Sequence, residues 1–163
     1  MKIAVYPGTF DPVTNGHMDI LNRAITIFDK VIIAVAEDNY KNTLFSLNER
    51  LQMLEEIAGK RPSVEVDTFE GLLVEYCKSV NAIAIVRGLR AVSDFEYELQ
   101  MALMNKKLND NLETIFLMTA AENSFVSSTI IKQVSVLGGC IEGLVPDFVA
   151  KKLRDKYMIA GES

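Results

Sequence analysis

The sequence contains only one histidine and two cysteines. A structural zinc site needs about four imidazole or thiolate ligands, and Cys77 and Cys140 lie in unrelated contexts with no CxxC pair. Disulfides are rare in a reducing cytosol, so two lone thiols fit that compartment. The scarcity of these residues therefore argues against a zinc site.

Long hydrophobic runs and an excess of basic residues are also missing. The longest apolar runs, such as Val31–Ala36, span about six residues, whereas a membrane-spanning helix needs about 20. The N-terminal run MKIAV is too short for a signal peptide. The formal net charge is −5, which disfavours nucleic-acid binding, because that binding depends on phosphate neutralisation by Lys and Arg. We expect a cytoplasmic protein that binds neither membrane nor nucleic acid.

Two common phosphate-binding fingerprints are absent as well, since the chain has neither GxGxxG nor GxxxxGK[ST]. What is present is an ordinary globular composition, with 49% hydrophobic and 24% charged residues over 163 positions. This length is usual for one domain. We therefore expect a single domain over residues 1–163.

Short β-branched runs alternate with longer amphipathic stretches. Strands are expected at Ile3–Tyr6, Val31–Ala36, Val64–Asp67, Ala82–Val86 and Thr114–Met118. Helices are expected at Gly16–Phe28, Ser46–Ile57, Leu72–Val80, Ser93–Leu108, Ser127–Leu137 and Asp147–Tyr157, with capping boxes opening at Ser46 and Ser93. This order predicts an α/β fold, a doubly wound parallel five-stranded sheet followed by C-terminal helices. Ligands of such sheets bind beyond the carboxyl ends of the strands.

The loop after the first expected strand runs from Tyr6 to His17 and contains Gly8 and Gly16. Thr14 is a plausible N-cap, which would put His17 in the first helical turn. A histidine there is well placed to donate a hydrogen bond to phosphate, because helix N-termini attract anions. The alternative is an exposed surface histidine.

Two arginines, Arg87 and Arg90, follow the fourth expected strand, and a guanidinium fork suits phosphate oxygens. The alternative is that they only pair with Asp94, Glu96 or Glu98. Three consecutive hydroxyls, Ser127-Ser128-Thr129, follow the fifth strand. Capping needs only one of them, and phosphate binding could use the others. On their own, Lys41, Leu73 and Cys77 are an ordinary exposed lysine, a core leucine and a small buried hydrophobe.

Two motifs together resemble the nucleotidylyltransferase superfamily: an (H/T)xGH motif at Thr14-Asn15-Gly16-His17, and an SST-type motif within Val126–Lys132. The longer stretches YPGTFDPVTNGH and RGLRAVSDFEYE narrow the resemblance to the bacterial phosphopantetheine adenylyltransferase family. The resemblance covers essentially the whole chain. It implies a Rossmann-like nucleotidylyltransferase fold.

The resemblance also implies roles for individual residues. His17, as the transition-state stabiliser, would act with Lys41 and Arg90 in catalysis. The acceptor would be bound by Thr9, Lys41, Leu73 and Arg87. ATP would be contacted by Thr9, Phe10, His17, Gly88, Leu89, Arg90, Glu98, Asn123, Ser124, Phe125, Val126, Ser127, Ser128 and Thr129. The chain departs from the family at Asn123, where an aromatic residue is common, and at Thr129, where serine is more usual.

The reaction implied by the resemblance is transfer of the adenylyl group of ATP to 4′-phosphopantetheine by direct in-line displacement. Mg²⁺ would be bound mostly through the ATP phosphates and water. The family further implies a homohexamer and feedback inhibition by coenzyme A. Two other functions stay open: a nucleotidylyltransferase for nicotinamide mononucleotide or a polyol phosphate, and a non-catalytic ATP-binding α/β module.

Overall fold

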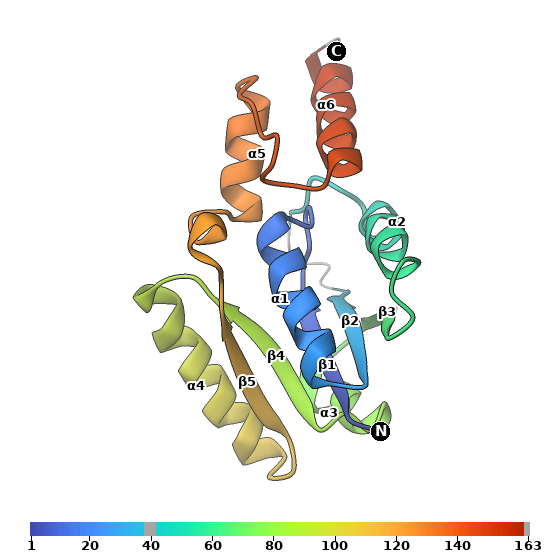
Figure 1. The fold of residues 1–163 in the computed structure, drawn as a ribbon, viewed down its shortest axis with the longest axis vertical. Coiled ribbons are helices and arrows are strands. Elements are labelled where there is room, and N and C mark those ends of the chain that lie inside the picture. Colours follow the sequence, from blue (N-terminus) through green and yellow to red (C-terminus); the bar gives the residue numbers. More distant parts are fainter. Residues whose placement is uncertain (38–41, 162–163) are drawn as a thin grey trace.

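The computed structural model describes residues 1–37 and 42–161. Its strands are β1 (Ile3–Gly8), β2 (Lys30–Ala36), β3 (Val64–Phe69), β4 (Ala84–Leu89) and β5 (Glu113–Met118). Its helices are α1 (Asn15–Ile27), α2 (Leu47–Ala58), α3 (Leu73–Ser79), α4 (Val92–Leu108), the 3-10 helix η1 (Ala121–Asn123), α5 (Ser128–Val136) and α6 (Asp147–Gly161). All strand pairs are parallel, in the order β3-β2-β1-β4-β5 (Figure 1). The expected doubly wound α/β fold is confirmed.

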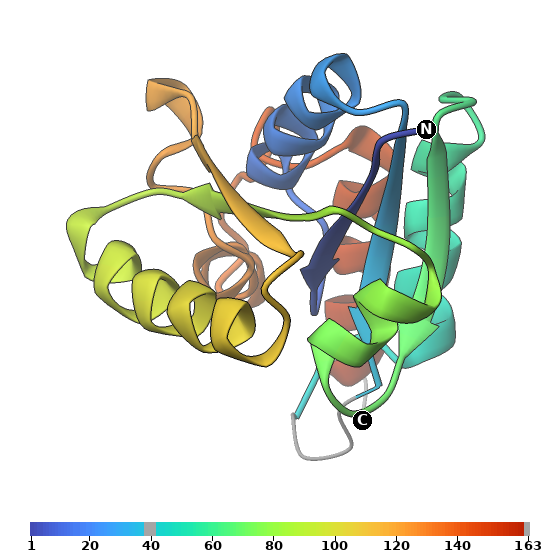
Figure 2. The same cartoon turned by 90° about the horizontal axis from the view of Figure 1, so that it is seen from below.

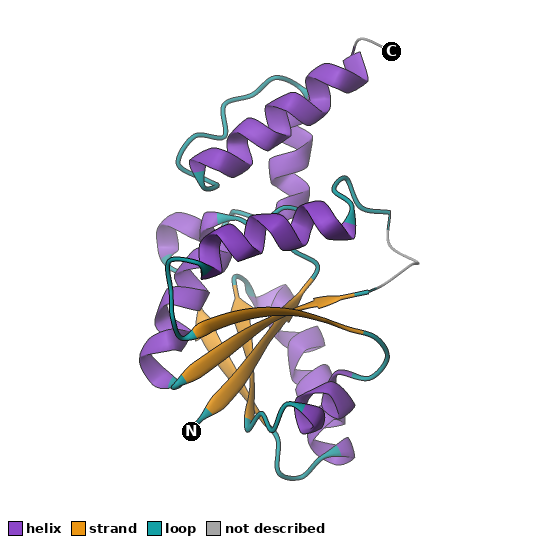
Figure 3. Cartoon of the chain, turned by 90° about the vertical axis from the view of Figure 1, so that its right-hand side faces the viewer, coloured by secondary structure: helices purple, strands orange, loops and turns teal. Residues whose placement is uncertain are grey.

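Helices cover both faces of the sheet (Figure 3). Successive residues of β1 point to opposite faces, so Ala4 and Tyr6 belong to one hydrophobic cluster and Val5 to the other. The larger cluster joins α1 and α2 to α5 and α6, and the smaller one includes Val74 and Cys77 of α3. Because both faces are covered, the central strands are apolar at successive positions, as the sequence indicated.

The order of the strands reverses between β1 and β4. From β1 the chain builds outward through β2 and β3, then crosses back to place β4 on the other side of β1. The carboxyl ends of neighbouring strands diverge at such a switch point, which leaves a crevice. In Figure 1, η1, α5 and α6 lie beyond this end of the sheet.

Two boundaries differ from the prediction in ways that matter for the crevice. Pairing with β5 continues β4 as far as Leu89, so Arg87 lies in the strand rather than in the loop after it. The capping box at Ser46 is confirmed, with Ser46 and Glu49 bonding each other's backbone N–H. The capping box expected at Ser93 is wrong, because α4 begins at Val92 and Ala91 is the N-cap residue.

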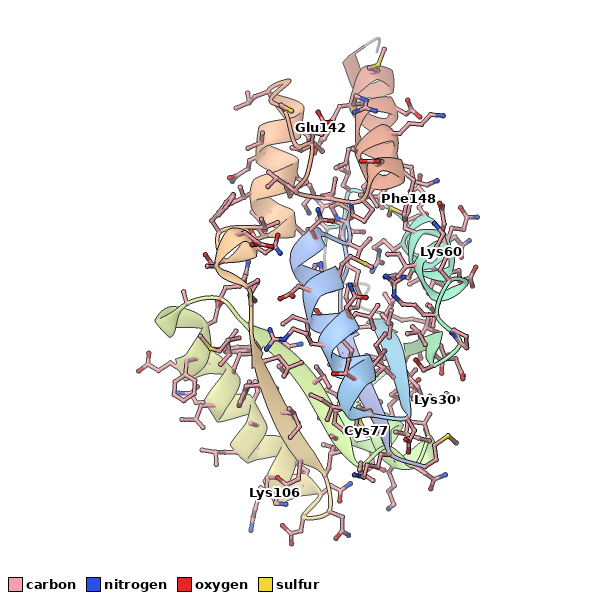
Figure 4. The ribbon with its side chains drawn as sticks, viewed as in Figure 1. Lys30, Lys60, Cys77, Lys106, Glu142 and Phe148 are labelled. Carbon is pink, nitrogen blue, oxygen red and sulfur yellow. The ribbon has the colours of Figure 1, made fainter. Side chains whose placement is uncertain are left out.

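One edge of the sheet carries an apolar surface. Helix α4 lies with β5 on the side of the molecule opposite α2 and β3 (Figure 2). Tyr97, Leu103, Met104 and Leu108 of α4 are each more than half exposed. Lys106, near the end of α4, lies at the opposite end of the molecule from Glu142 and Phe148 (Figure 4). None of the described helices has the length and apolarity needed to span a bilayer.

Candidate functional site

A cavity of about 320 Å³ opens at the switch point. Four segments form it: the end of β1 with the start of α1, the end of β4 with the start of α4, Thr119 directly after β5, and the N-terminus of α5. Its lining includes Gly8, Thr9, Thr14, Gly16, His17, Arg87, Gly88, Arg90, Asp94, Glu98, Val126, Ser127, Ser128 and Thr129. The structure thus brings together most of the residues predicted from the sequence.

His17 closes an unusual capping box at the start of α1. Thr14 is the N-cap residue, as expected, and its backbone N–H donates to Nδ1 of His17 at 3.0 Å. Since Nδ1 accepts this bond, a neutral ring carries its proton on Nε2. Burial, reinforced by the charges of Arg90 and Arg87, lowers the pKa of His17 to about 4. The imidazole is therefore neutral near pH 7, with an Nε2–H group to donate.

Phe10 supports the imidazole of His17 from inside the protein. The centroids of the two rings lie 4.9 Å apart in an edge contact, and Phe10 is only 3% exposed. Gly8 leaves room for this arrangement, because a Cβ atom at that position would lie 2.9 Å from the Phe10 ring. Phe10 does not line the cavity among the described residues, so it contributes through the orientation of His17.

Arg87 is fixed by its neighbours on the wall of the cavity. Its Nε donates to Oε2 of Glu98 at 2.8 Å and its Nη2 donates to Oε1 at 2.5 Å, which makes a bidentate pair. Its Nη1 also donates to the carbonyl oxygen of Pro7 at 3.1 Å. These bonds hold the guanidinium plane in one orientation and join β4, α4 and β1.

Arg90 is less tightly held. Its Nε lies 3.3 Å from Oδ2 of Asp94, and its Nη1 donates to the carbonyl oxygen of Val126 at 3.4 Å. The alternative that both arginines pair with nearby carboxylates is thus realised in the structure. Both arginines also line the cavity, so pairing and anion binding are compatible here.

The three hydroxyls at the start of α5 have different neighbours, although all three residues line the cavity. Ser127 is the N-cap and accepts from the backbone N–H of Ile130 at 3.2 Å. Ser128 donates to the carbonyl oxygen of Pro12 at 2.7 Å, which ties α5 to the first loop. Capping accounts for Ser127 alone, and Thr129 adds its hydroxyl to the lining.

Several predicted residues lie elsewhere. Leu89 is buried and is not part of the described lining. Asn123 and Ser124 belong to or follow η1, and Phe125 is 59% exposed; the described lining includes none of the three. Lys41 falls outside the described residues. Of the predicted residues in segment 123–129, only Val126 and the three hydroxyl residues belong to the described lining.

A second cavity of about 350 Å³ adjoins the first. Both are lined by Pro7, Gly8, Thr9, Arg87 and Glu98, so the ion pair of Arg87 and Glu98 lies between them. The second cavity is further lined by Ala36, Phe69, Leu73, Ile85, Tyr97, Met101, Ala102, Asn105 and Thr114. Leu73 lines this cavity and also packs, partly buried, against the smaller hydrophobic cluster.

Sequence reasoning missed the contribution of α4 to this second cavity. Tyr97, Met101 and Asn105 are spaced four residues apart and lie on one helix face. That spacing was a usable signal, but apolar residues occur all round this helix, so no single face stood out. Among residues 1–37 and 42–161 no cluster of three or more His, Cys, Asp or Glu side chains could hold a metal ion.

Comparison with known proteins gives concordant matches. The cytidylyltransferase-like family matches residues 5–134. A phosphopantetheine adenylyltransferase of Moorella thermoacetica is 60% identical over 157 residues, covering 96% of this chain and 98% of the relative. One of Carboxydothermus hydrogenoformans is 56% identical over 161 residues, covering 99% of each.

A solved structure from Vibrio parahaemolyticus, assigned as a nicotinate-nucleotide adenylyltransferase, superposes with a TM-score of 0.67. It covers 94% of this chain and 99% of its own, at 16% identity. At that identity the match establishes the fold alone.

Proposed function

This chain belongs to the cytidylyltransferase-like family and, within it, to the phosphopantetheine adenylyltransferases, and on that premise we propose that it transfers the adenylyl group of ATP to 4′-phosphopantetheine. The products are dephospho-coenzyme A and pyrophosphate. The observation that carries the proposal is that two cavities meet at Arg87. The first is lined by groups that can bind phosphate, and the second has apolar side chains around Leu73 beside polar ones, which suits an uncharged arm that carries amide groups.

The reaction is an in-line displacement at the α-phosphorus of ATP. The acceptor phosphate is already an anion, so its attack needs no general base. The enzyme's task is to hold two mutually repelling anions in line and to stabilise the developing charge. Arg87, at the shared wall, and Lys41 hold the acceptor phosphate, while Arg90 contacts the triphosphate.

His17 donates its Nε2–H to an oxygen of the α-phosphate as charge develops there. The bond from Thr14 to Nδ1 supports this role, because it fixes the tautomer and the ring plane before substrate arrives. The lowered pKa keeps the ring neutral, so the donor does not change with pH around 7. A neutral donor also leaves the positive charge of the site to Arg87, Arg90 and Lys41.

ATP lies across the first cavity. Thr9 and Gly88 both line this cavity. Position 88 leaves little room for a side chain, since a Cβ atom there would lie 3.0 Å from Cγ1 of Ile20. The remaining nucleotide contacts come from Glu98, Val126, Ser127, Ser128 and Thr129, which line this cavity, whereas Phe10 acts through its contact with His17. If ATP binds as its magnesium complex, the ion would be held mostly through triphosphate oxygens and water, and it would offset part of the triphosphate charge.

We also propose a homohexamer in the cytoplasm. The exposed apolar side chains of α4 support association, because contiguous apolar surface of this kind marks interaction sites. Coenzyme A, which carries both an adenylate and a pantetheine arm, would occupy both cavities and act as a feedback inhibitor. Light scattering of the purified protein tests the assembly, and inhibition of turnover by added coenzyme A tests the regulation.

The proposed reaction is tested by incubating the purified chain with ATP, Mg²⁺ and 4′-phosphopantetheine and following dephospho-coenzyme A by mass spectrometry. Nicotinamide mononucleotide and a polyol phosphate serve as parallel acceptors. Product from either of these, and none from 4′-phosphopantetheine, would assign a different nucleotidylyltransferase. ATP binding without pyrophosphate release from any acceptor would assign a non-catalytic module.

A further inference from the structure

Asp11 is a buried carboxylate that the proposed reaction does not use. Its residue is only 3% exposed. Oδ1 accepts from the backbone N–H of Phe45 at 2.8 Å, and Oδ2 accepts from the backbone N–H of Leu44 at 2.9 Å. Oδ2 also pairs with Nζ of Lys132 at 2.8 Å. One carboxylate therefore joins the β1–α1 loop, the segment before α2, and helix α5.

The same three segments are linked by a second set of bonds. Arg50, which is also buried, donates from Nη1 to the carbonyl oxygen of Thr9 at 2.9 Å and from Nε to that of Phe45 at 3.2 Å. Ser128 donates to the carbonyl oxygen of Pro12 on the other side. Hydrogen bonds of the Asp11, Arg50 and Ser128 side chains thus hold residues 9–12 to Phe45 and to α5.

The positions joined in this way flank the first cavity. Thr9 and His17 lie on either side of Asp11 along the chain, and the start of α5 supplies Ser127, Ser128 and Thr129 to the lining. Neither Asp11 nor Lys132 lines that cavity or the adjoining one among the described residues. Any effect of Asp11 on chemistry must therefore pass through the placement of other groups.

We propose that Asp11 is a positioning residue for adenylyl transfer. Its carboxylate holds His17 and Thr9 in place relative to the hydroxyl residues of α5 and to the segment before α2. The inference rests on the proposed function for its kinetic consequences, but the bracing itself is independent of the substrate. An in-line displacement is sensitive to the relative positions of these groups, because a small misplacement of the reacting groups lowers the rate by a large factor.

The decisive variant is Asp11→Asn. It keeps the shape of the side chain but replaces one acceptor oxygen with a donor NH₂ group. In either orientation of the amide at least one of the three donors faces NH₂ instead of oxygen. We expect kcat to fall roughly 10- to 100-fold, because the groups are misplaced, while the KM for ATP changes by less than about threefold.

Glu49→Gln is the matched control. Glu49 pairs with Lys156 at 2.9 Å and lies outside the described lining of both cavities, so this variant also removes an ion pair between two helices. All rates are measured well below the unfolding midpoint of each variant. If the kcat of Asp11→Asn matches that of Glu49→Gln within about twofold, Asp11 is merely structural and the proposal is wrong.

Lys132 provides a second test if Asp11→Asn does not fold. We expect Lys132→Met to lose roughly 3- to 10-fold in kcat and Lys132→Arg to stay within about twofold of the unmodified chain, because arginine can still pair with Asp11. Unchanged kcat in both variants would overturn the proposal.

Hydrogen exchange separates this inference from the proposed function. In Asp11→Asn, or in Lys132→Met, the amides of Leu44 and Phe45 and the first turn of α5 should exchange roughly tenfold faster than in Glu49→Gln. This result does not depend on turnover. Absence of dephospho-coenzyme A with the unmodified chain would refute the reaction alone, whereas unchanged exchange at both segments would refute the bracing.

Discussion

The two cavities that meet at Arg87 differ in the kinds of side chain that line them. The first is lined by turns of the backbone, by Arg87 and Arg90, by the hydroxyl residues Ser127, Ser128 and Thr129, and by the neutral His17. The second shares Arg87 and Glu98 with the first, and adds apolar side chains that include Phe69, Leu73, Met101 and Ala102. The difference indicates that the site receives one strongly anionic ligand and one ligand with a long uncharged part. A site for ATP alone would need only the first cavity.

The largest effect should come from the first cavity. We expect His17→Ala to lower kcat about 10²–10³-fold, corresponding to roughly 3–4 kcal/mol, because a preorganised donor to the transition state is lost. The KM for the acceptor should change little. Initial rates of pyrophosphate release measure this. Thr26→Ala, at an exposed position of the same helix, is the control, and a folded His17→Ala variant with undiminished turnover would contradict the role of the imidazole.

A substitution of Arg87, which lies between the two cavities, should weaken the use of the acceptor. Lysine keeps the charge but cannot form the bidentate pair with Glu98. We expect Arg87→Lys to reduce kcat/KM for 4′-phosphopantetheine roughly 10- to 100-fold, since a charge-assisted bond contributes about 1.5–3 kcal/mol. Varying each substrate in turn measures it. A loss confined to the KM for ATP would place the acceptor phosphate elsewhere.

The second cavity offers a smaller effect with a neighbouring control. Leu73→Ala removes apolar surface from the lining, and we expect the KM for 4′-phosphopantetheine to rise about tenfold, a loss of roughly 1–2 kcal/mol. The KM for ATP should be unchanged. Leu72 is 59% exposed and is not part of the described lining, so Leu72→Ala should leave both constants unaltered. Equal effects of the two substitutions would remove the distinction between the cavities.

The smallest effect concerns pH. His17 has a folded-state pKa of about 4, compared with an ordinary value of 6.5. Between these values the unfolded chain binds more protons, so His17 favours folding fully above pH 6.5, and this contribution is lost as pH falls to about 4. Unfolding midpoints across this window should fall less steeply with acidification in His17→Ala. At constant ionic strength, kcat should show no histidine ionisation near pH 6.5; a clear one would contradict a neutral donor.

The sequence was sufficient for the fold and for most of the first cavity, because alternating buried strands and amphipathic helices imply the sheet, and the sheet implies where its loops converge. It was not sufficient where pairing overrides local preference. Arg87-Gly88-Leu89 looks like a loop in sequence, yet pairing with Phe116, Leu117 and Met118 keeps it in β4. That extension is what points Arg87 at the shared wall.

Long-range polar bonds were also beyond the sequence. The bond from Ser128 to Pro12 and the pair of Asp11 with Lys132 join residues more than a hundred positions apart. A hydroxyl group near the end of a strand can donate to a phosphate or to a carbonyl oxygen, and the sequence does not show which. In the folded chain Ser128 donates to the carbonyl oxygen of Pro12. The second cavity was missed for a related reason, since α4 has apolar side chains on all its faces and its lining face does not stand out.

The most direct test is a crystal structure with dephospho-coenzyme A, which would occupy both cavities at once. The account predicts that its diphosphate lies between Nε2 of His17 and the guanidinium of Arg87, with the adenylate beside Ser127–Thr129 and the pantetheine arm against Leu73 and Met101. A pantetheine arm bound away from the second cavity, or a diphosphate out of reach of His17, would contradict it.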